Sequence, residues 1–258
     1  MKYLRIIYRL TALVILSISG LVLMGIYSPR GKSQKNILGI SQKQKNIRAW
    51  WLKKVVSIVG ITLSVKGESH KESAIWVANH VSWLDIPIIG SEGAAFLSKA
   101  EVRKWPVIGW LGEKGGTVFI QRGGKNASQK ASEKISETIK AGDNILIFPE
   151  ATTDNGYELK QFHARIFAPA IDHQLSVQPI AIRYLDAQGD FHPAVFWGDE
   201  SFMNNLMSIL GASGIHAELT FFPIIEGHKF SERKPLAKHA ETQIREVVEK
   251  STNQSKLN

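Results

Sequence analysis

Residues 74–85 read AIWVANHVSWLD, and the rest of the chain is interpreted around this stretch. It opens with an apolar run typical of a buried strand, and a histidine and an aspartate five positions apart, His80 and Asp85, follow that strand. At a strand exit such a pair suits general base catalysis, because a carboxylate can orient the imidazole that accepts a proton. On a continuous helix the two side chains would lie about 140° apart, so they meet only if the backbone turns between them.

Ser82 offers a second interpretation of the same stretch. Ser82 and Asp85 have the spacing of a helix capping box. Asp85 would then only cap a helix, and His80 would be a histidine whose hydrogen bonds are satisfied at the end of a strand. Residues 79–85 alone leave both interpretations open.

Beyond residue 60, short apolar runs alternate with helical patterns. This alternation predicts an α/β domain with a mixed central sheet covered by helices. The expected strands are 61–66, 74–78, 94–98, 117–121, 145–148, 177–183 and 217–222. Covering helices are expected over 125–140, over 201–210 and from Pro235 onward. Pro179 lies inside an expected strand, which indicates an edge strand or a bulge.

Composition and charge divide the 258 residues unevenly. The chain has no cysteine, which excludes disulfides, thiolate metal ligands and a cysteine nucleophile. The formal net charge is +9, yet residues 1–67 hold twelve Lys or Arg and no acid, whereas the remainder holds 20 basic and 23 acidic residues. The basic character therefore belongs to the N-terminal quarter.

A membrane explains this quarter better than a nucleic acid does, because residues 10–27 form an uncharged run of 18 residues. As a helix the run would measure about 27 Å, slightly less than a hydrocarbon core of ~30 Å. More basic residues follow the run than precede it, which predicts an anchor in the cytoplasmic membrane with the catalytic body on the cytoplasmic side. A cleaved signal peptide is the alternative, but no small-x-small cleavage site follows.

The next segment, residues 47–59, has a helical pattern that ends at Gly60. Trp50 and Trp51 stand beside two lysines, a mixture typical of a helix at anionic lipid headgroups. An ordinary packing helix with tryptophans in the core is the alternative. We therefore expect a membrane anchor and basic interfacial segment over 1–60, the α/β domain over 61–250 and a frayed tail over 251–258.

Two further motifs place polar groups at strand ends. Arg122 follows a strand bracketed by glycines, GGTVFIQRGG at residues 115–124, and its guanidinium can hold a phosphate or a carboxylate; a surface arginine beside a turn is the alternative. Glu150 follows the apolar run ILIFP at residues 145–149. Its carboxylate can hold substrate hydroxyls or fix an arginine, or it can cap the next element.

Together these blocks resemble the 1-acylglycerol-3-phosphate acyltransferase family. The family motif N-H-x-x-x-x-D matches residues 79–85, its glycine–strand–arginine motif matches 116–122, and its V-x-P-[IV] strand matches 177–180. The motif F-P-E-G-T-R matches residues 148–153 in part. The resemblance implies that His80 and Asp85 are catalytic, and it implies a set of substrate-binding residues: Gly116, Arg122, Glu150 and Thr152.

Two departures from the third motif concern the acceptor. Ala151 replaces a glycine, and Thr153 replaces the arginine that in the family helps to bind the acceptor's phosphate. Either Arg165 supplies this charge or the charge is missing. The run from Thr152 to Gly156 is similar to the branch that acylates lyso-ornithine lipid. We expect 1-acyl-sn-glycerol-3-phosphate as the acceptor, giving phosphatidic acid, with lyso-ornithine lipid as the alternative.

The resemblance implies direct acyl transfer from acyl carrier protein or coenzyme A, used as co-substrates without a cofactor. No metal is expected, since His80 and Asp85 alone are too few ligands for a dedicated site. A serine esterase is disfavoured because Ser82 is not part of a G-x-S-x-G elbow. A nucleic-acid partner is not expected, because it would leave the uncharged run unexplained. A catalytically silent membrane protein with the same fold remains an alternative.

Overall fold

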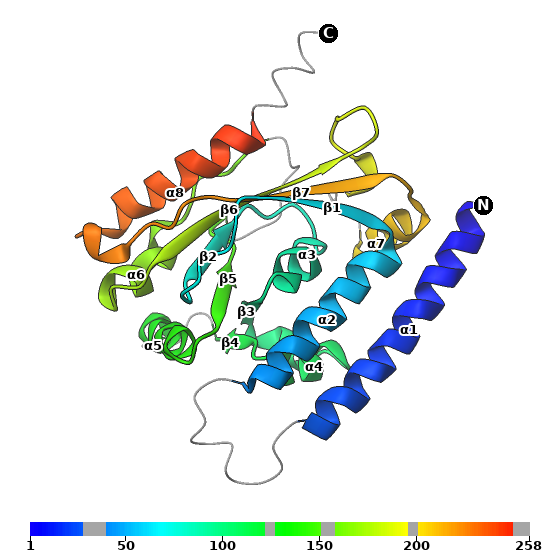
Figure 1. The fold of residues 1–258 in the computed structure, drawn as a ribbon, viewed down its shortest axis with the longest axis horizontal. Coiled ribbons are helices and arrows are strands. Elements are labelled where there is room, and N and C mark those ends of the chain that lie inside the picture. Colours follow the sequence, from blue (N-terminus) through cyan, green and yellow to red (C-terminus); the bar gives the residue numbers. More distant parts are fainter. Residues whose placement is uncertain (28–39, 122–126, 151–157, 196–200, 250–258) are drawn as a thin grey trace.

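The computed structural model describes residues 1–27, 40–121, 127–150, 158–195 and 201–249, which form a seven-stranded sheet with helices on both faces (Figure 1). The strand order is β1-β7-β6-β2-β5-β3-β4. Every expected strand is present, which confirms the predicted mixed α/β class. The strands are β1 Ile61–Lys66, β2 Ile75–Ala78, β3 Ala94–Lys99, β4 Val118–Ile120, β5 Asn144–Ile147, β6 Val177–Leu185 and β7 Ile215–Phe221.

Strand direction determines where the site forms. β2 runs parallel to β5 and β6, β3 runs parallel to β5 and β4, and only β1 and β7 run the other way. The segments that follow β2, β3, β4 and β5 therefore gather at one edge of the sheet, here called the carboxyl edge. In open α/β sheets ligands bind outside the carboxyl ends of parallel strands.

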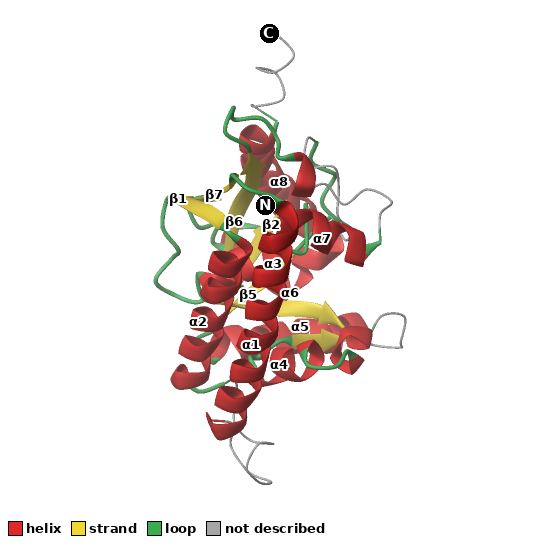
Figure 2. Ribbon diagram, turned by 90° about the vertical axis from the view of Figure 1, so that its right-hand side faces the viewer, coloured by secondary structure: helices red, strands yellow, loops and turns green. Residues whose placement is uncertain are grey.

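Helices cover the two faces of the sheet separately. Figure 1 shows α1, α2, α3 and α7 on one side and α5, α6 and α8 on the other, and Figure 2 shows the same layers from the side of α1. The α-helices are α1 Lys2–Tyr27, α2 Gln42–Val59, α3 Asp85–Ser91, α4 Ile108–Lys114, α5 Ala127–Lys140, α6 Ala168–Asp172, α7 Phe202–Gly211 and α8 Arg233–Val248. Short 3₁₀ helices are η2 Ala100–Lys104, η3 Ala164–Phe167, η4 Pro193–Val195 and η5 Gly227–Lys229.

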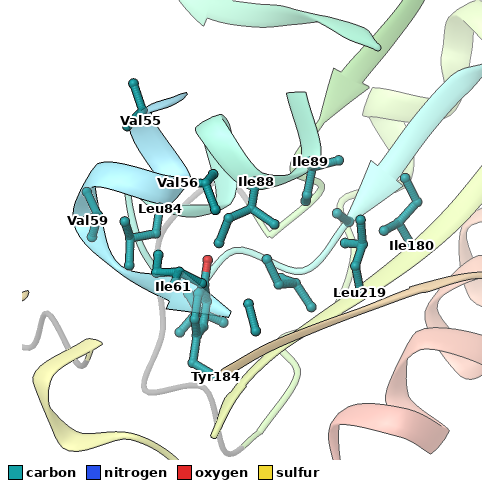
Figure 3. Close-up of a cluster of buried hydrophobic side chains, with 14 of the residues drawn as sticks. Val55, Val56, Val59, Ile61, Leu84, Ile88, Ile89, Ile180, Tyr184 and Leu219 are labelled. Atoms are coloured by element: carbon teal, nitrogen blue, oxygen red, sulfur yellow. The ribbon is translucent and has the colours of Figure 1, made fainter. Parts of the chain in front are cut away.

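Each face of the sheet has its own apolar core. Because side chains alternate along a strand, Ile75 and Val77 of β2 face α5 and α8, whereas Trp76 and Ala78 face α2 and α3. Figure 3 shows the second core, where side chains of α2 and α3 meet Ile180 and Leu219 of the sheet. The strand that ends at the candidate site is therefore buried on both faces.

The first sixty residues share this core. Val55, Val56 and Val59 of α2 and Leu16 of α1 belong to the same buried cluster as the strand residues. The N-terminal segment and the sheet therefore share one buried core.

The two tryptophans of α2 have different surroundings, so the predicted place at lipid headgroups stays a prediction for Trp50 and does not fit Trp51. Trp50 is 43% exposed. The indole Nε1 of Trp51, in contrast, donates to the carbonyl of Leu16 on α1 at 2.9 Å. Trp51 therefore packs between α1 and α2, because the indole N–H finds a backbone acceptor on the neighbouring helix.

Helix α1 has two different faces. Arg9, Leu16, Gly20 and Met24 are buried against the rest of the protein, while the opposite face exposes aliphatic side chains. Among the described residues, α1 is the one helix with the length and apolar composition needed to cross a membrane. It begins eight residues before the uncharged run, at Lys2.

Pro179 does not lie on an edge strand as one interpretation of the sequence expected. β6 pairs with β2 on one side and with β7 on the other. The Pro179 carbonyl accepts from Phe222 N at 3.0 Å, immediately beyond the end of β7. Between the pairs Val177–Ile225 and Ile180–Phe221 the partner chain has one more residue than β6, so the ladder is already irregular where the proline lacks its donor.

Candidate active site

The exit of β2 is fixed by Asn79. Its side-chain amide donates to the carbonyl of Ile182 at 2.9 Å and accepts from the N–H of the same residue at 2.8 Å. Asn79 is 2% exposed, so these bonds form in a dry environment where an unpaired amide would be costly. The next residue, His80, therefore begins from a rigid position on the carboxyl edge.

The Asp85 carboxylate brings the loop from β2 to α3 together. Its Oδ2 atom accepts from the backbone N–H groups of Val81 at 2.7 Å and Ser82 at 2.9 Å and lies 2.8 Å from His80 Nδ1. Helix α3 begins at Asp85 itself, and its N-cap Leu84 makes no side-chain capping bond, so Ser82 and Asp85 do not form the capping box that the sequence offered as an alternative. The Asp85 carboxylate instead closes the loop before α3 and contacts the imidazole.

The imidazole of His80 presents its second nitrogen to the surface. The tautomer of neutral imidazole that fits this contact has its proton on Nδ1, which donates to the carboxylate, and it keeps the lone pair of Nε2. The ring stacks on Phe148 with centroids 4.0 Å apart and planes inclined by 14°. The His80 side chain is 19% exposed. A partly accessible base with a fixed orientation results.

The structure adds a residue that the sequence did not suggest. Tyr184 of β6 is fully buried, and its hydroxyl donates to Asp85 Oδ1 at 2.6 Å. Burial, and then the charge of Asp85 and the hydrogen bond to it, raise the pKa of Tyr184 well above its ordinary value of 10.0. The hydroxyl therefore remains a donor, and Asp85 accepts on both oxygens. The hydroxyl of a buried tyrosine requires a hydrogen-bond partner, but the sequence does not show which residue provides it.

Glu150 lies beside the same loop, with its carboxylate turned toward backbone. Its Oε1 accepts from His80 N at 2.7 Å and its Oε2 from Lys160 N at 3.1 Å. The side chain is 4% exposed. Glu150 therefore supports the backbone of His80, and its predicted contact with substrate stays a prediction.

The remaining predicted residues do not all gather at this edge. Gly116 lies at the opposite, amino edge, where its φ of +87° suits glycine and Arg48 of α2 packs against it. Arg165 is exposed on η3, in a segment that His163 N ties to the carbonyl of Pro149 at 3.1 Å. Arg122 and Thr152 lie outside the described residues.

A second helix contacts the loop after His80. Trp83 Nε1 donates to Asn205 Oδ1 of α7 at 3.2 Å, and the indole meets Phe202 edge to face at 6.1 Å. Asn205 is fully buried, whereas Phe202 is 42% exposed. The loop that carries His80 and Asp85 is thus supported from β6, from α7 and from Glu150.

Known proteins are similar to this chain in sequence and in fold. A family model described as Acyltransferase matches residues 43–183. The chain is 40% identical over 183 residues to the lyso-ornithine lipid O-acyltransferase of Pseudomonas aeruginosa, covering 70% of each. It is 30% identical over 222 residues to the 1-acyl-sn-glycerol-3-phosphate acyltransferase of Neisseria gonorrhoeae, covering 84% of this chain and 87% of the relative.

The fold has a solved counterpart in the crystal structure of the 1-acyl-sn-glycerophosphate acyltransferase of Thermotoga maritima. The two chains are 22% identical and superpose with a TM-score of 0.71 over 98% of each. The matched family model spans the strand, the loop and the carboxylate described above. This chain belongs to the acyltransferase family that includes 1-acyl-sn-glycerol-3-phosphate acyltransferases and lyso-ornithine lipid O-acyltransferases.

Proposed function

We propose that this protein transfers a fatty acyl group from a thioester to the free hydroxyl of a lyso-lipid, with His80 as the general base. The observation that carries the proposal is the 2.8 Å contact between His80 Nδ1 and Asp85 Oδ2, which leaves Nε2 as an acceptor at the surface of the carboxyl edge. General base catalysis of this kind contributes about 10²–10⁴-fold to the rate.

The proposed reaction requires one proton relay and no covalent enzyme intermediate. His80 Nε2 takes the acceptor hydroxyl's proton while that oxygen bonds to the thioester carbonyl carbon. The carbon–sulfur bond of the resulting oxyanion then breaks, and the imidazolium returns the proton to the departing thiolate. Asp85 stabilises the imidazolium between the two steps. The products are an ester and a free thiol, from acyl carrier protein or coenzyme A.

A pair of histidine variants tests this role. His80→Ala should abolish transfer in purified, detergent-solubilised protein while the circular dichroism spectrum shows that the protein stays folded. His70→Ala is the matched control, because His70 precedes β2 at the amino edge and should leave turnover at the wild-type level. Turnover near the wild-type rate in folded His80→Ala protein would refute the proposal.

The acceptor headgroup is the finer part of the proposal. The sequence favoured 1-acyl-sn-glycerol-3-phosphate, with lyso-ornithine lipid second. Two observations support lyso-ornithine lipid: Thr153 stands where the family motif has an arginine, and identity is 40% to an enzyme named for that acceptor but 30% to one named for 1-acyl-sn-glycerol-3-phosphate. We therefore propose lyso-ornithine lipid as the preferred acceptor.

A competition assay separates the two acceptors. Both lipids are offered in one detergent mixture, and kcat/KM is measured for each. A charged hydrogen bond contributes about 1.5–3 kcal/mol, so the missing arginine should weaken use of the phosphate acceptor about 10- to 150-fold. Thr153→Arg should shift preference toward 1-acyl-sn-glycerol-3-phosphate, and Thr153→Lys tests whether charge alone suffices. A tenfold preference of the wild type for the phosphate acceptor would reverse the assignment.

The membrane location of the reaction follows from the same proposal. The acceptor is a membrane lipid, and α1 has the composition of a membrane helix. We propose that the protein works at the cytoplasmic membrane with its carboxyl edge on the cytoplasmic side, where the basic residues after the uncharged run meet anionic lipid.

A further inference from the structure

The connection between β3 and β4, at the end of η2 and the start of α4, exposes a group of apolar side chains. Within the tryptophan loop, defined as residues 103–110, Trp105 is 54% exposed, Val107 36%, Ile108 48% and Trp110 37%. The loop begins after β3, so its start lies at the carboxyl edge, and β5 alone separates β3 from β2, which ends at Ala78, two residues before His80. Strands lie about 4.8 Å apart, which places the roots of the two segments about 10 Å from each other.

Val107 has a backbone conformation that a β-branched residue avoids. Its φ is +63° and its ψ is −61°, and Ile108 N donates to the carbonyl of Pro106 at 2.7 Å, which closes a γ-turn. This form of the γ-turn is rare and strained. The turn holds the Val107 side chain at the surface. The strained backbone is therefore not compensated by burial of this side chain, which points to a functional contact there.

The loop is braced from within. Arg103 forms two hydrogen bonds with the Glu113 carboxylate, at 2.7 and 3.1 Å. Gly109 allows close packing, because a Cβ there would lie 2.2 Å from the carbonyl oxygen of Arg103. Trp105 and Val107 therefore project from a turn that this ion pair and this close packing hold in place.

The apolar loop continues onto α1 and is accompanied by positive charge. A Cβ added to Gly25 would lie 4.0 Å from Trp110, so this indole lies against α1, a helix that also exposes Val22 and Ile26. Residues 99–114 hold four basic and two acidic side chains, and one of the acids, Glu113, is paired with Arg103. Tryptophans among lysines next to an apolar helix are typical of the lipid headgroup region.

We propose that the tryptophan loop is a second membrane contact, inserted into the headgroup region of an anionic bilayer beside α1. Its apolar residues would then seat the carboxyl edge against the lipid surface, so that an acceptor reaches His80 without leaving the membrane. The inference concerns docking and goes beyond the proposed chemistry.

The absence of cysteine in the sequence makes a depth measurement possible on the full chain. Val107→Cys and Ile108→Cys carry a nitroxide label in two separate proteins reconstituted into vesicles of phosphatidylglycerol and phosphatidylethanolamine. Val65→Cys is the matched control, because Val65 is an exposed valine on β1, at the far end of the sheet. We expect both loop labels to collide more with dissolved oxygen than with an aqueous nickel chelate, and the Val65 label to show the reverse.

The measurement also identifies a competing occupant. Water accessibility of both loop labels equal to that of the Val65 label overturns the proposal. If, in that case, adding acidic acyl carrier protein protects both loop labels from the aqueous nickel chelate, the loop binds protein instead of lipid. Neither result depends on turnover, so the docking proposal and the catalytic proposal fail separately.

A kinetic experiment adds a functional readout. Lys104→Gln removes one exposed charge from the loop and should lower partitioning onto phosphatidylglycerol vesicles about fivefold, with little effect on phosphatidylcholine vesicles. The rate on a short-chain acceptor in detergent should stay at the wild-type level. An equal change on both kinds of vesicle would contradict an electrostatic contact.

Discussion

At the residue scale, the Asp85 carboxylate has three partner types: backbone N–H groups, an imidazole and a phenol. A short histidine–aspartate motif indicates that the pair exists, but Tyr184 is 99 residues away in sequence. Its hydroxyl holds Oδ1 so that Oδ2 remains with the backbone and the imidazole. We infer that Tyr184 is a positioning residue that acts through Asp85.

Tyr184→Phe tests this inference with almost no change in volume. Losing a hydrogen bond to a charged group should lower the free energy of unfolding by about 1.5–3 kcal/mol and lower kcat, with KM for both substrates unchanged. The pH–rate profile should also shift, which a purely structural role would not cause. Tyr8→Phe is the control, since Tyr8 is 70% exposed. A wild-type kcat and pH profile in Tyr184→Phe would limit Tyr184 to packing.

The raised pKa of Tyr184 also predicts how stability depends on pH. The folded state keeps the phenol protonated above pH 10.0, the ordinary value, whereas the unfolded state loses the proton there. The resulting stability is fully present below that pH and is lost as pH rises beyond it. The free energy of unfolding, measured at about pH 8 to 11, should therefore fall more steeply in the wild type than in Tyr184→Phe. Parallel curves would contradict this.

At the element scale, α1 is joined to α7 by a buried arginine. Arg9 donates to the carbonyls of Leu210 at 3.0 Å and Ala212 at 2.8 Å, at the C-terminal end of α7, where carbonyls lack partners within the helix. Gly60, the C-cap of α2, makes room for it, because a Cβ there would lie 1.9 Å from Arg9 Nη2. Three helices thus meet at one guanidinium.

Gly60→Ala should separate this contact from simple backbone strain. Gly60 has φ +81° and Gly189 has φ +87°, but a Cβ at Gly189 would meet nothing within 4 Å. Both alanine variants incur the left-handed penalty of about 1–2 kcal/mol. Gly60→Ala should lose about 1.5–3 kcal/mol more, because Arg9 is displaced. Equal losses in denaturant unfolding would show that Arg9 relocates without cost.

At the scale of the whole molecule, α2 joins the N-terminal segment to the sheet. Arg48 forms two bonds to Asp143, which precedes β5, and also donates to the carbonyls of Gly115, before β4, and Gly93, before β3. Both charged side chains are nearly inaccessible, at 5% and 3%. One arginine of the basic segment therefore fastens the amino ends of three strands.

Asp143→Asn should consequently destabilise the entire fold. It leaves Arg48 buried without its counter-charge, which costs about 3–5 kcal/mol. The control is Glu137→Gln in the exposed pair with Lys134, where a change of about 0–1 kcal/mol is expected. Denaturant unfolding in detergent measures both. A similar small change in each variant would mean that water reaches Arg48.

The strands, the longer helices and the location of the candidate base could be predicted from local patterns of residues. Apolar runs and helical periods are local, so they carry over directly into β1 to β7 and into α2, α5, α7 and α8. The short helices α3, α4 and α6 span seven, seven and five residues, too few for a period to be recognised. His80 and Asp85 were recognisable because the loop that joins them is only four residues long.

The groups that surround His80 and Asp85 could not be predicted in the same way, because they depend on how the strands are arranged. Tyr184 reaches Asp85 because β6 lies beside β2 in the sheet, and Glu150 reaches His80 N because β5 lies on the other side. Gly116 is separated from them because it precedes its strand and therefore lies at the opposite edge. Strand order and direction bring residues far apart in sequence together or hold them apart, and neither is expressed in the local pattern of residues.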